Sequence, residues 1–215
     1  MREPELDQAS RAAGDRMRTP DGCAADEIDI ARARQYALLS VLLERPPDSD
    51  LLAGLVALRG DTSPLGLAHM GLAEAARAAK VEHIEREYFD LFVGIGRGEL
   101  VPYASYYLTG FLNERPLARL RNDLARLGIE RVEGKAEPED HAAMLCELMA
   151  GLADRRFEKA GRVDRELFER HVSPWMGRFF ADLEQAQVAN FYRRVGRVGR
   201  IFIAIETEAF TLAAA

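Results

Sequence analysis

Apolar residues recur three and four positions apart along most of the chain, which is the spacing of one face of an α-helix. The run from Tyr36 to Leu43 is almost entirely apolar, and the Pro46-Pro47 pair ends it. Alternation of apolar and polar residues, the pattern of a half-buried strand, is not sustained over any stretch. The pattern therefore predicts an all-α fold, a bundle-like domain of about eight to ten helices.

Start and stop signals give approximate boundaries for these helices. A first helix is expected over residues 27–44, and Ser63-Pro64 starts another, because a capping hydroxyl followed by proline favours a helix start. Glu137-Pro138 is expected to begin a further helix. The last helix is expected over residues 187–210, with apolar residues on one face and arginines on the other.

The first 26 residues differ from the rest of the chain. They mix charges with Gly14, Pro20 and Gly22 and contain almost no large apolar side chain. Such a segment cannot bury enough apolar surface to offset the entropy lost on ordering. We therefore expect residues 1–26 to be a mobile tail and residues 27–215 to form the all-helical domain.

Composition narrows the function classes. The chain has 215 residues, of which 48% are hydrophobic and 30% are charged, as in ordinary globular proteins. The N-terminus lacks the apolar region of an export signal, and no uncharged run is long enough for a membrane span, so a cytoplasmic location is expected. Cys23 and Cys146 have no paired spacing that would suggest a disulfide scaffold or a zinc site.

No catalytic or metal-binding pattern is present in the sequence. The histidines show no HExxH spacing and no glutamate three residues before a histidine, so no metal is expected. A GxSxG element is absent, and neither cysteine has the local signature of a nucleophile. The spacing of these residues therefore offers no candidate catalytic or metal centre.

Two stretches could contact phosphate. The run Gly94, Gly96, Arg97 and Gly98 resembles a phosphate-cradling loop, but it follows a predicted helix and lacks the Gly-Lys-Ser/Thr of a P-loop, so a tight turn is the favoured interpretation. Arg193, Arg194, Arg197 and Arg200 form a basic patch, yet the net charge of −6 favours a solvated helix face over nucleic-acid binding. Nucleotide binding, and less strongly DNA binding by a helical regulator, remain the alternatives.

Three stretches carry a family resemblance. The first contains Tyr88-Phe-Asp-Leu91-Phe92 and, after the glycine loop, Pro102-Tyr103-Ala-Ser105. The second is Glu137-Pro138-Glu139-Asp140-His141, and the third is Phe168-x-x-His171-x-x-Pro174-Trp175, followed by Phe191-Tyr192. In this order they resemble the signatures of the TorD/DmsD family of redox-enzyme maturation chaperones.

The resemblance implies a cytoplasmic chaperone, not an enzyme, that binds the twin-arginine signal peptide of a molybdenum-containing oxidoreductase. It would delay export until the cofactor is inserted, without itself retaining the molybdenum cofactor. Its client would be the apo-form of a catalytic subunit of the formate dehydrogenase, trimethylamine N-oxide reductase or dimethyl sulfoxide reductase type. Some relatives are associated with weak GTP binding, and no nucleic-acid partner is implied. The long loop over residues 93–103 could serve as a hinge, so either a monomer or a domain-swapped dimer is expected.

The resemblance also suggests a peptide site. A signal peptide combines a basic and an apolar region, so its receptor needs carboxylates beside an apolar groove. The expected site contains Tyr88, Leu91, Phe92, Pro102, Tyr103, Ser105, Glu137, Pro138, Asp140 and His141. Asp140 and Glu137 are assigned to the basic region, His141 to a hydrogen bond within the site or to the peptide backbone, and the apolar and aromatic members to the wall.

Each assignment has a structural alternative. Asp140 could complement a helix dipole, and His141 could be a buried histidine with its hydrogen bonds satisfied. Tyr88, Leu91 and Phe92 have the spacing of any buried helix face. Trp175 and His171 are expected in the core, because tryptophan is heavily buried on average.

Overall fold

The computed structural model describes residues 20–129, 137–154 and 160–212, and these form a helical protein, as predicted. Among them, isolated backbone pairing between Tyr103 and His141 is the only β-type contact, and ten α-helices are present. The helices are α1 (Pro20–Glu44), α2 (Ser49–Val56), α3 (Pro64–Ala78), α4 (Val81–Tyr88), α5 (Ala104–Thr109), α6 (Arg115–Leu127), α7 (Ala142–Ala153), α8 (Ala160–Leu167), α9 (Met176–Gln185) and α10 (Phe191–Leu212). Two π-helices, η1 (Phe89–Val93) and η2 (Phe168–Val172), continue α4 and α8.

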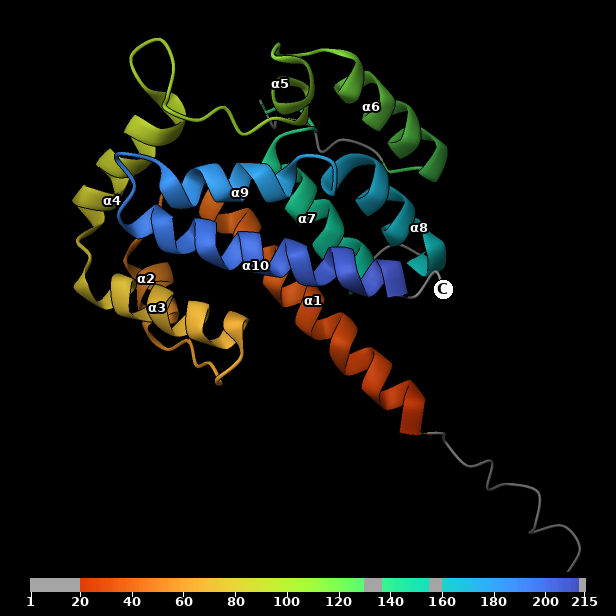
Figure 1. Cartoon of the computed structure of the whole chain (residues 1–215), viewed down its shortest axis with the longest axis horizontal. Coiled ribbons are helices and arrows are strands. Elements are labelled where there is room, and N and C mark those ends of the chain that lie inside the picture. The colour runs from red at the N-terminus through yellow and green to blue at the C-terminus, as the bar shows by residue number, and fades with distance from the viewer. Residues whose placement is uncertain (1–19, 130–136, 155–159, 213–215) are drawn as a thin grey trace, which may run out of the picture.

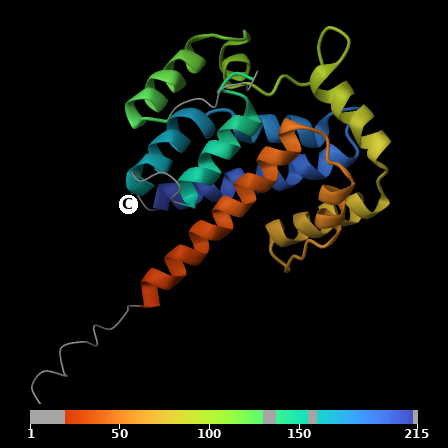
Figure 2. The same cartoon turned by 180° about the vertical axis from the view of Figure 1, so that it is seen from behind.

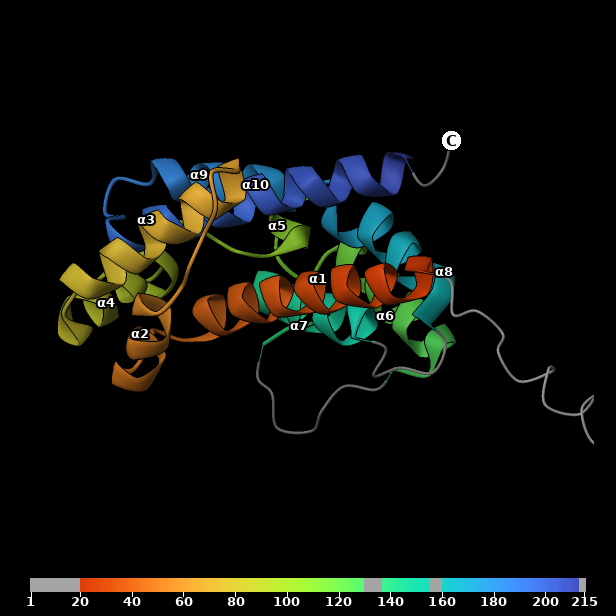
Figure 3. The same ribbon diagram turned by 90° about the horizontal axis from the view of Figure 1, so that it is seen from below.

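The helices pack in two layers around one apolar core. α1 lies against α7, while α9 and α10 run side by side in opposite directions (Figures 1 and 2). The view from below places α9 and α10 in one layer and α1 and α7 in the other (Figure 3). The core between them contains the fully buried rings of Tyr36, Trp175, Phe179, Phe180 and Tyr192. No helix in the described part of the chain is both long and apolar enough to cross a bilayer.

Several start and stop signals act as the sequence predicts. The Ser63 side chain accepts a hydrogen bond from the backbone N–H of Gly66 and caps α3, with Pro64 in the first turn. Gly128 ends α6 in the left-handed conformation, with φ of 69°. The turn of Pro46 and Pro47 separates α1 from α2. Local chemistry at these positions is therefore sufficient to place the helix ends.

Three predicted boundaries differ from the structure. Helix α1 begins at Pro20 and not at Glu27, because proline is favoured in the first turn and the Ala-rich stretch after it continues the helix. Residues 1–19 of the expected tail lie outside the described part of the chain. Helix α7 begins at Ala142, since residues 138–141 form a turn. Helix α10 begins at Phe191, where the Glu87 carboxylate accepts hydrogen bonds from the N–H groups of Asn190, Phe191 and Tyr192.

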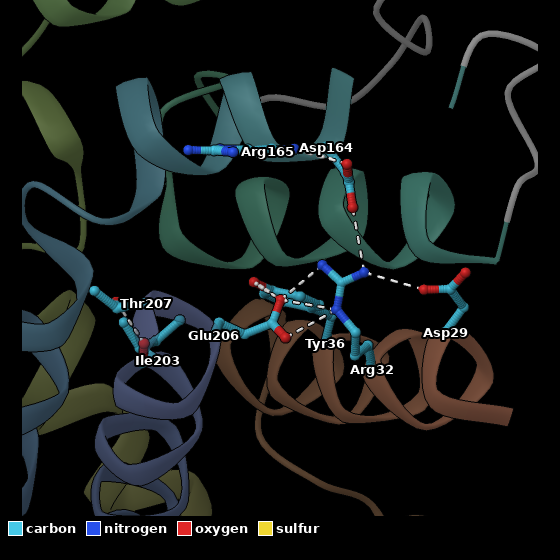
Figure 4. A network of polar contacts seen from close by, with 8 residues as sticks. All are labelled: Asp29, Arg32, Tyr36, Asp164, Arg165, Ile203, Glu206 and Thr207. Carbon is cyan, nitrogen blue, oxygen red and sulfur yellow. Dashed lines mark hydrogen bonds and ion pairs between the residues drawn. The ribbon is translucent and has the colours of Figure 1, made fainter. Parts of the chain in front are cut away.

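A buried ionic network joins α1, α8 and α10 (Figure 4). Arg32 donates to Glu206 through Nε (2.8 Å) and Nη2 (2.9 Å), and its Nη1 lies 3.2 Å from both Asp29 and Asp164. The Tyr36 hydroxyl donates to Glu206 at 3.0 Å. Glu206 is only 2% exposed, so these donors compensate a buried charge.

Candidate functional site

The motif that contains Pro102 and Tyr103 and the motif that ends in Asp140 and His141 lie next to each other in the structure. The N–H of Ala142 donates to the carbonyl of Pro102 at 2.8 Å, and the N–H of Ala104 donates to the carbonyl of Asp140 at 3.0 Å. This short antiparallel pairing places Tyr103 opposite His141. Since Tyr103 directly precedes α5 and His141 directly precedes α7, the pairing joins the starts of two helices, and we call it the junction.

Asp140 faces the protein interior. Its side chain is 1% exposed, and Oδ2 accepts a hydrogen bond from the backbone N–H of Ser105 at 2.8 Å, in the first turn of α5. The second oxygen, Oδ1, and the Ser105 hydroxyl are buried without a hydrogen-bond partner. The Asp140 carboxylate therefore holds the start of α5 in this conformation, and a peptide could reach it only if the paired segments separated.

His141 is also mostly buried, and it caps α7. Its Nδ1 accepts a hydrogen bond from the backbone N–H of Ala143 at 3.1 Å, so the neutral ring carries its proton on Nε2. Burial lowers the pKa of His141, although the carboxylates of Glu137 and Asp140 act in the opposite direction. The imidazole is thus neutral at pH 7, with one N–H available as a donor.

Tyr103 and Glu137 form the exposed part of this junction. The Tyr103 hydroxyl donates to Glu137 Oε2, and its ring lies edge-on to His141, with centroids 4.9 Å apart. Burial and the hydrogen bond to Glu137 raise the pKa of Tyr103, so the hydroxyl remains a donor at neutral pH. Pro138 contributes its carbonyl, which accepts the N–H of His141 at 3.1 Å. Within the second motif, Glu137 is the exposed carboxylate.

The aromatic segment of α4 and η1 lies beside the junction. Tyr88 contacts the rings of Phe92 (5.1 Å between centroids) and Tyr192 (5.8 Å), and its hydroxyl donates to the carbonyl of Glu44 at 2.9 Å. Burial raises the pKa of Tyr88 to about 12, and the negative charges of Glu137 and Glu44 add to this effect. Tyr88 and Tyr103 therefore share the field of one carboxylate, Glu137.

The residues predicted to form the apolar wall of the peptide site lie partly in the core and partly at the surface. Leu91 and Pro102 are buried, so Leu91 packs as an ordinary core residue, whereas Tyr88, Phe92 and Tyr103 are half-buried. Trp175 and His171 lie in the core as expected: the indole N–H donates to the carbonyl of His171 at 2.8 Å.

The glycine loop is a structured turn. Gly94 and Gly96 have φ values of 62° and 89°, the left-handed region that favours glycine. The N–H of Gly94 donates to the carbonyl of Phe89 at 2.7 Å, and Arg97 donates to the Tyr106 hydroxyl at 3.2 Å. Nucleotide binding by Gly94, Gly96, Arg97 and Gly98 stays a prediction; the loop follows a helix, and these two donors are engaged within the protein.

Two residues at the site were not among the site residues predicted from the sequence. The ring of Tyr192, from the start of α10, is tilted against Tyr88 and lies edge-on to Phe92, and its hydroxyl donates to the carbonyl of Leu42 at 3.1 Å. The Phe191-Tyr192 pair in the family pattern was the available signal. Glu44 had none, because its place beside Tyr88 depends on how α1 packs. No group of three or more potential metal ligands occurs in the described residues.

Comparison with known proteins identifies the family. The family model described as nitrate reductase delta subunit matches residues 59–181, more than half of the chain. The chaperone protein TorD of Shewanella loihica is 25% identical over 205 residues, which cover 83% of this chain and 92% of that protein. The chaperone protein TorD of Vibrio cholerae serotype O1 is 27% identical over 126 residues, 54% of this chain and 57% of the relative.

A solved structure shares the fold. A crystal structure of a protein from Archaeoglobus fulgidus, described as a redox enzyme maturation protein, superposes with a TM-score of 0.58 at 21% identity. The match covers 80% of this chain and 93% of the other. The fold, the family model and the named relatives agree, and the chain belongs to the TorD family of redox-enzyme maturation chaperones.

Proposed function

We propose that this chain is a cytoplasmic chaperone that binds the twin-arginine signal peptide of a molybdoenzyme catalytic subunit. By holding that peptide, it delays export until the cofactor has been inserted. The chaperone names of the relatives support the general role. The observation that carries the finer proposal is the surface where the Glu137 carboxylate meets Tyr103 and Tyr88, because it combines negative charge with aromatic faces.

The charge of this surface suits the basic part of such a peptide. Glu137 is exposed, and Glu44 is exposed at the C-terminal end of α1, where the helix dipole is negative. A peptide guanidinium could pair with either carboxylate and stack on the tyrosine rings, which attract cations through their faces. Asp140 and His141 then act by holding α5 and α7 in register, and the Nε2–H of His141 is a donor for a peptide carbonyl.

The test is a fluorescence-anisotropy titration with labelled twin-arginine signal peptides from several molybdoenzymes. Each peptide is paired with a form in which both arginines are lysines and a form with a scrambled apolar region. Submicromolar to micromolar binding of one peptide that is lost on scrambling supports the proposal and nominates the client. Flat curves for the whole panel, with the protein folded by circular dichroism, would contradict it.

A further inference from the structure

The exposed apolar residues near the site are not those expected from the sequence motif. Leu91 is fully buried, while Ile95 is 100% exposed and Val93 is 51% exposed, only a few residues further along the same segment. Phe89, on the same π-helix, is exposed too. A peptide with an apolar region would therefore meet Val93 and Ile95 in this conformation and not Leu91.

The backbone explains why Ile95 leaves the core. In a continuous α-helix, position 95 would lie on the same face as Tyr88, Leu91 and Phe92, because it follows them by seven, four and three residues. The π-helical turn and the positive φ of Gly94 end that face before residue 95. The isoleucine is consequently fully exposed in the loop that follows η1. This loop, beyond α4, projects at the upper edge of Figures 1 and 2.

The loop is fixed at its base. The N–H groups of Glu99 and Leu100 donate to the carbonyls of Asp90 (3.1 Å) and Leu91 (2.8 Å). Gly98 is buried, and a Cβ atom there would lie 2.4 Å from the Leu91 carbonyl oxygen, so the strand of chain that returns from the tip packs directly on η1. Ile95 is thus held in solvent by a defined structure.

A second exposed apolar segment adjoins the loop. Leu108, Phe111 and Leu112 are exposed at the end of α5 and just after it. The Arg97 guanidinium lies over the Tyr106 ring, 5.6 Å from its centroid, which ties the loop to α5. Exposed apolar side chains are therefore present on both of the segments that the contact between Arg97 and Tyr106 joins.

We propose that Val93 and Ile95, with the exposed end of α5 beside them, form the docking surface for the apolar region of the signal peptide, an inference that rests on the proposed function. The distribution of charge argues for this occupant. Glu44 and Glu137 lie at the Tyr88 end, whereas the loop tip is apolar and carries the positive Arg97. A basic stretch followed by an apolar stretch matches this order, and Arg97 repels the peptide arginines from the tip.

The spacing fits the same occupant. Val93 follows Tyr88 by five helical positions, a rise of about 7.5 Å at ~1.5 Å per residue. About two residues of extended peptide, at ~3.3 Å each, cover that distance. The arginines can therefore lie at the acidic end while the apolar region that follows them reaches the loop.

The test uses the full chain and the twin-arginine peptide that binds best. The double variant Val93→Ser/Ile95→Ser should bind it at least tenfold more weakly. The matched control is Ile205→Ser, which removes an isoleucine that is 44% exposed on the far part of α10 and should leave affinity within twofold of wild type. A peptide with serines in its apolar region should bind wild type and the double variant equally weakly, because the two losses report one contact.

The outcomes separate this inference from the proposed function. If wild type binds the peptide and the double variant binds equally well, the apolar region docks elsewhere and the inference is wrong while the function stands. If wild type binds no peptide in the panel, the proposed function itself fails. If the double variant differs from wild type only in its oligomeric state by sedimentation velocity, the surface holds a second copy of this chain, which also overturns the inference.

Discussion

The ionic network between α1, α8 and α10 predicts that Arg32→Ala lowers the stability of the protein more than Glu206→Gln does. Arg32 and Glu206 have side chains that are 16% and 2% exposed. Arg32→Ala would leave the Glu206 carboxylate buried with the Tyr36 hydroxyl as its one remaining donor in the network. Removal of one partner of a buried ion pair costs about 3–5 kcal/mol, because the remaining charge is desolvated without compensation.

Glu206→Gln should cost less. The amide can still accept from Arg32 and from the Tyr36 hydroxyl, and Arg32 keeps Asp29 and Asp164, each 3.2 Å away. The loss is the difference between a charge-assisted and a neutral hydrogen bond, about 1 kcal/mol. The double variant Arg32→Ala/Glu206→Gln should therefore be more stable than Arg32→Ala alone, since no uncompensated charge remains.

Urea unfolding followed by circular dichroism measures these differences, with an unchanged slope as evidence that only stability has changed. The relevant quantity is the loss in the free energy of unfolding of Arg32→Ala relative to wild type. A deficit below about 1 kcal/mol, or a larger one for Glu206→Gln, would refute the assignment of the network as a buried, compensated charge.

Two further predictions follow from single sites. Burial is the main cause that lowers the pKa of His69, His141 and His171, so the unfolded chain binds these protons more readily and stability should fall as pH drops from about 7 through 6.5. His171→Gln retains a hydrogen-bond donor to Asp123 and should reduce the slope of the free energy of unfolding against pH by at most about 1.4 kcal/mol per pH unit. Urea unfolding at several pH values measures this slope. An unchanged slope would argue against a neutral His171 in the folded protein. Gly98→Ala should destabilise the protein by about 1–3 kcal/mol, because the new Cβ atom would overlap the backbone of η1. The control Gly54→Ala, in α2, places a Cβ atom with no neighbour within 4 Å and should stabilise the protein by about 0.5–1 kcal/mol. Equal thermal midpoints for the two variants would contradict the packing of the loop on η1.

The helical fold could be predicted because its signals are local. The capping side chain of Ser63 with Pro64, the left-handed Gly128 and the three- and four-residue spacing of apolar positions each act within one or two turns of a helix. Boundaries failed where a distant residue decides them. Glu87 fixes the start of α10, and its role depends on a contact between residues more than a hundred positions apart.

The candidate site could be predicted in its membership more than in its geometry. The motifs with Tyr103 and His141 do meet, but no spacing in the sequence indicates that Asp140 points inward to the start of α5. Likewise, helical periodicity places Ile95 on the buried face with Leu91. The π-helical turn and the positive φ of Gly94 expose it instead, and helical periodicity alone does not indicate such a turn.

In the proposed function, the exposed carboxylate of Glu137, beside Tyr88 and Tyr103, receives the basic part of the signal peptide. The most direct measurement is the affinity of Glu137→Gln for a twin-arginine peptide, against a control, Glu208→Gln, that removes an exposed carboxylate of α10 away from the site. We expect Glu137→Gln to bind the peptide about tenfold more weakly than wild type, a difference of about 1.4 kcal/mol, and the control to bind it as tightly as wild type. The difference for Glu137→Gln should shrink at higher salt, because salt screens the charge. Equal affinity of wild type and Glu137→Gln at low salt would contradict this role of Glu137.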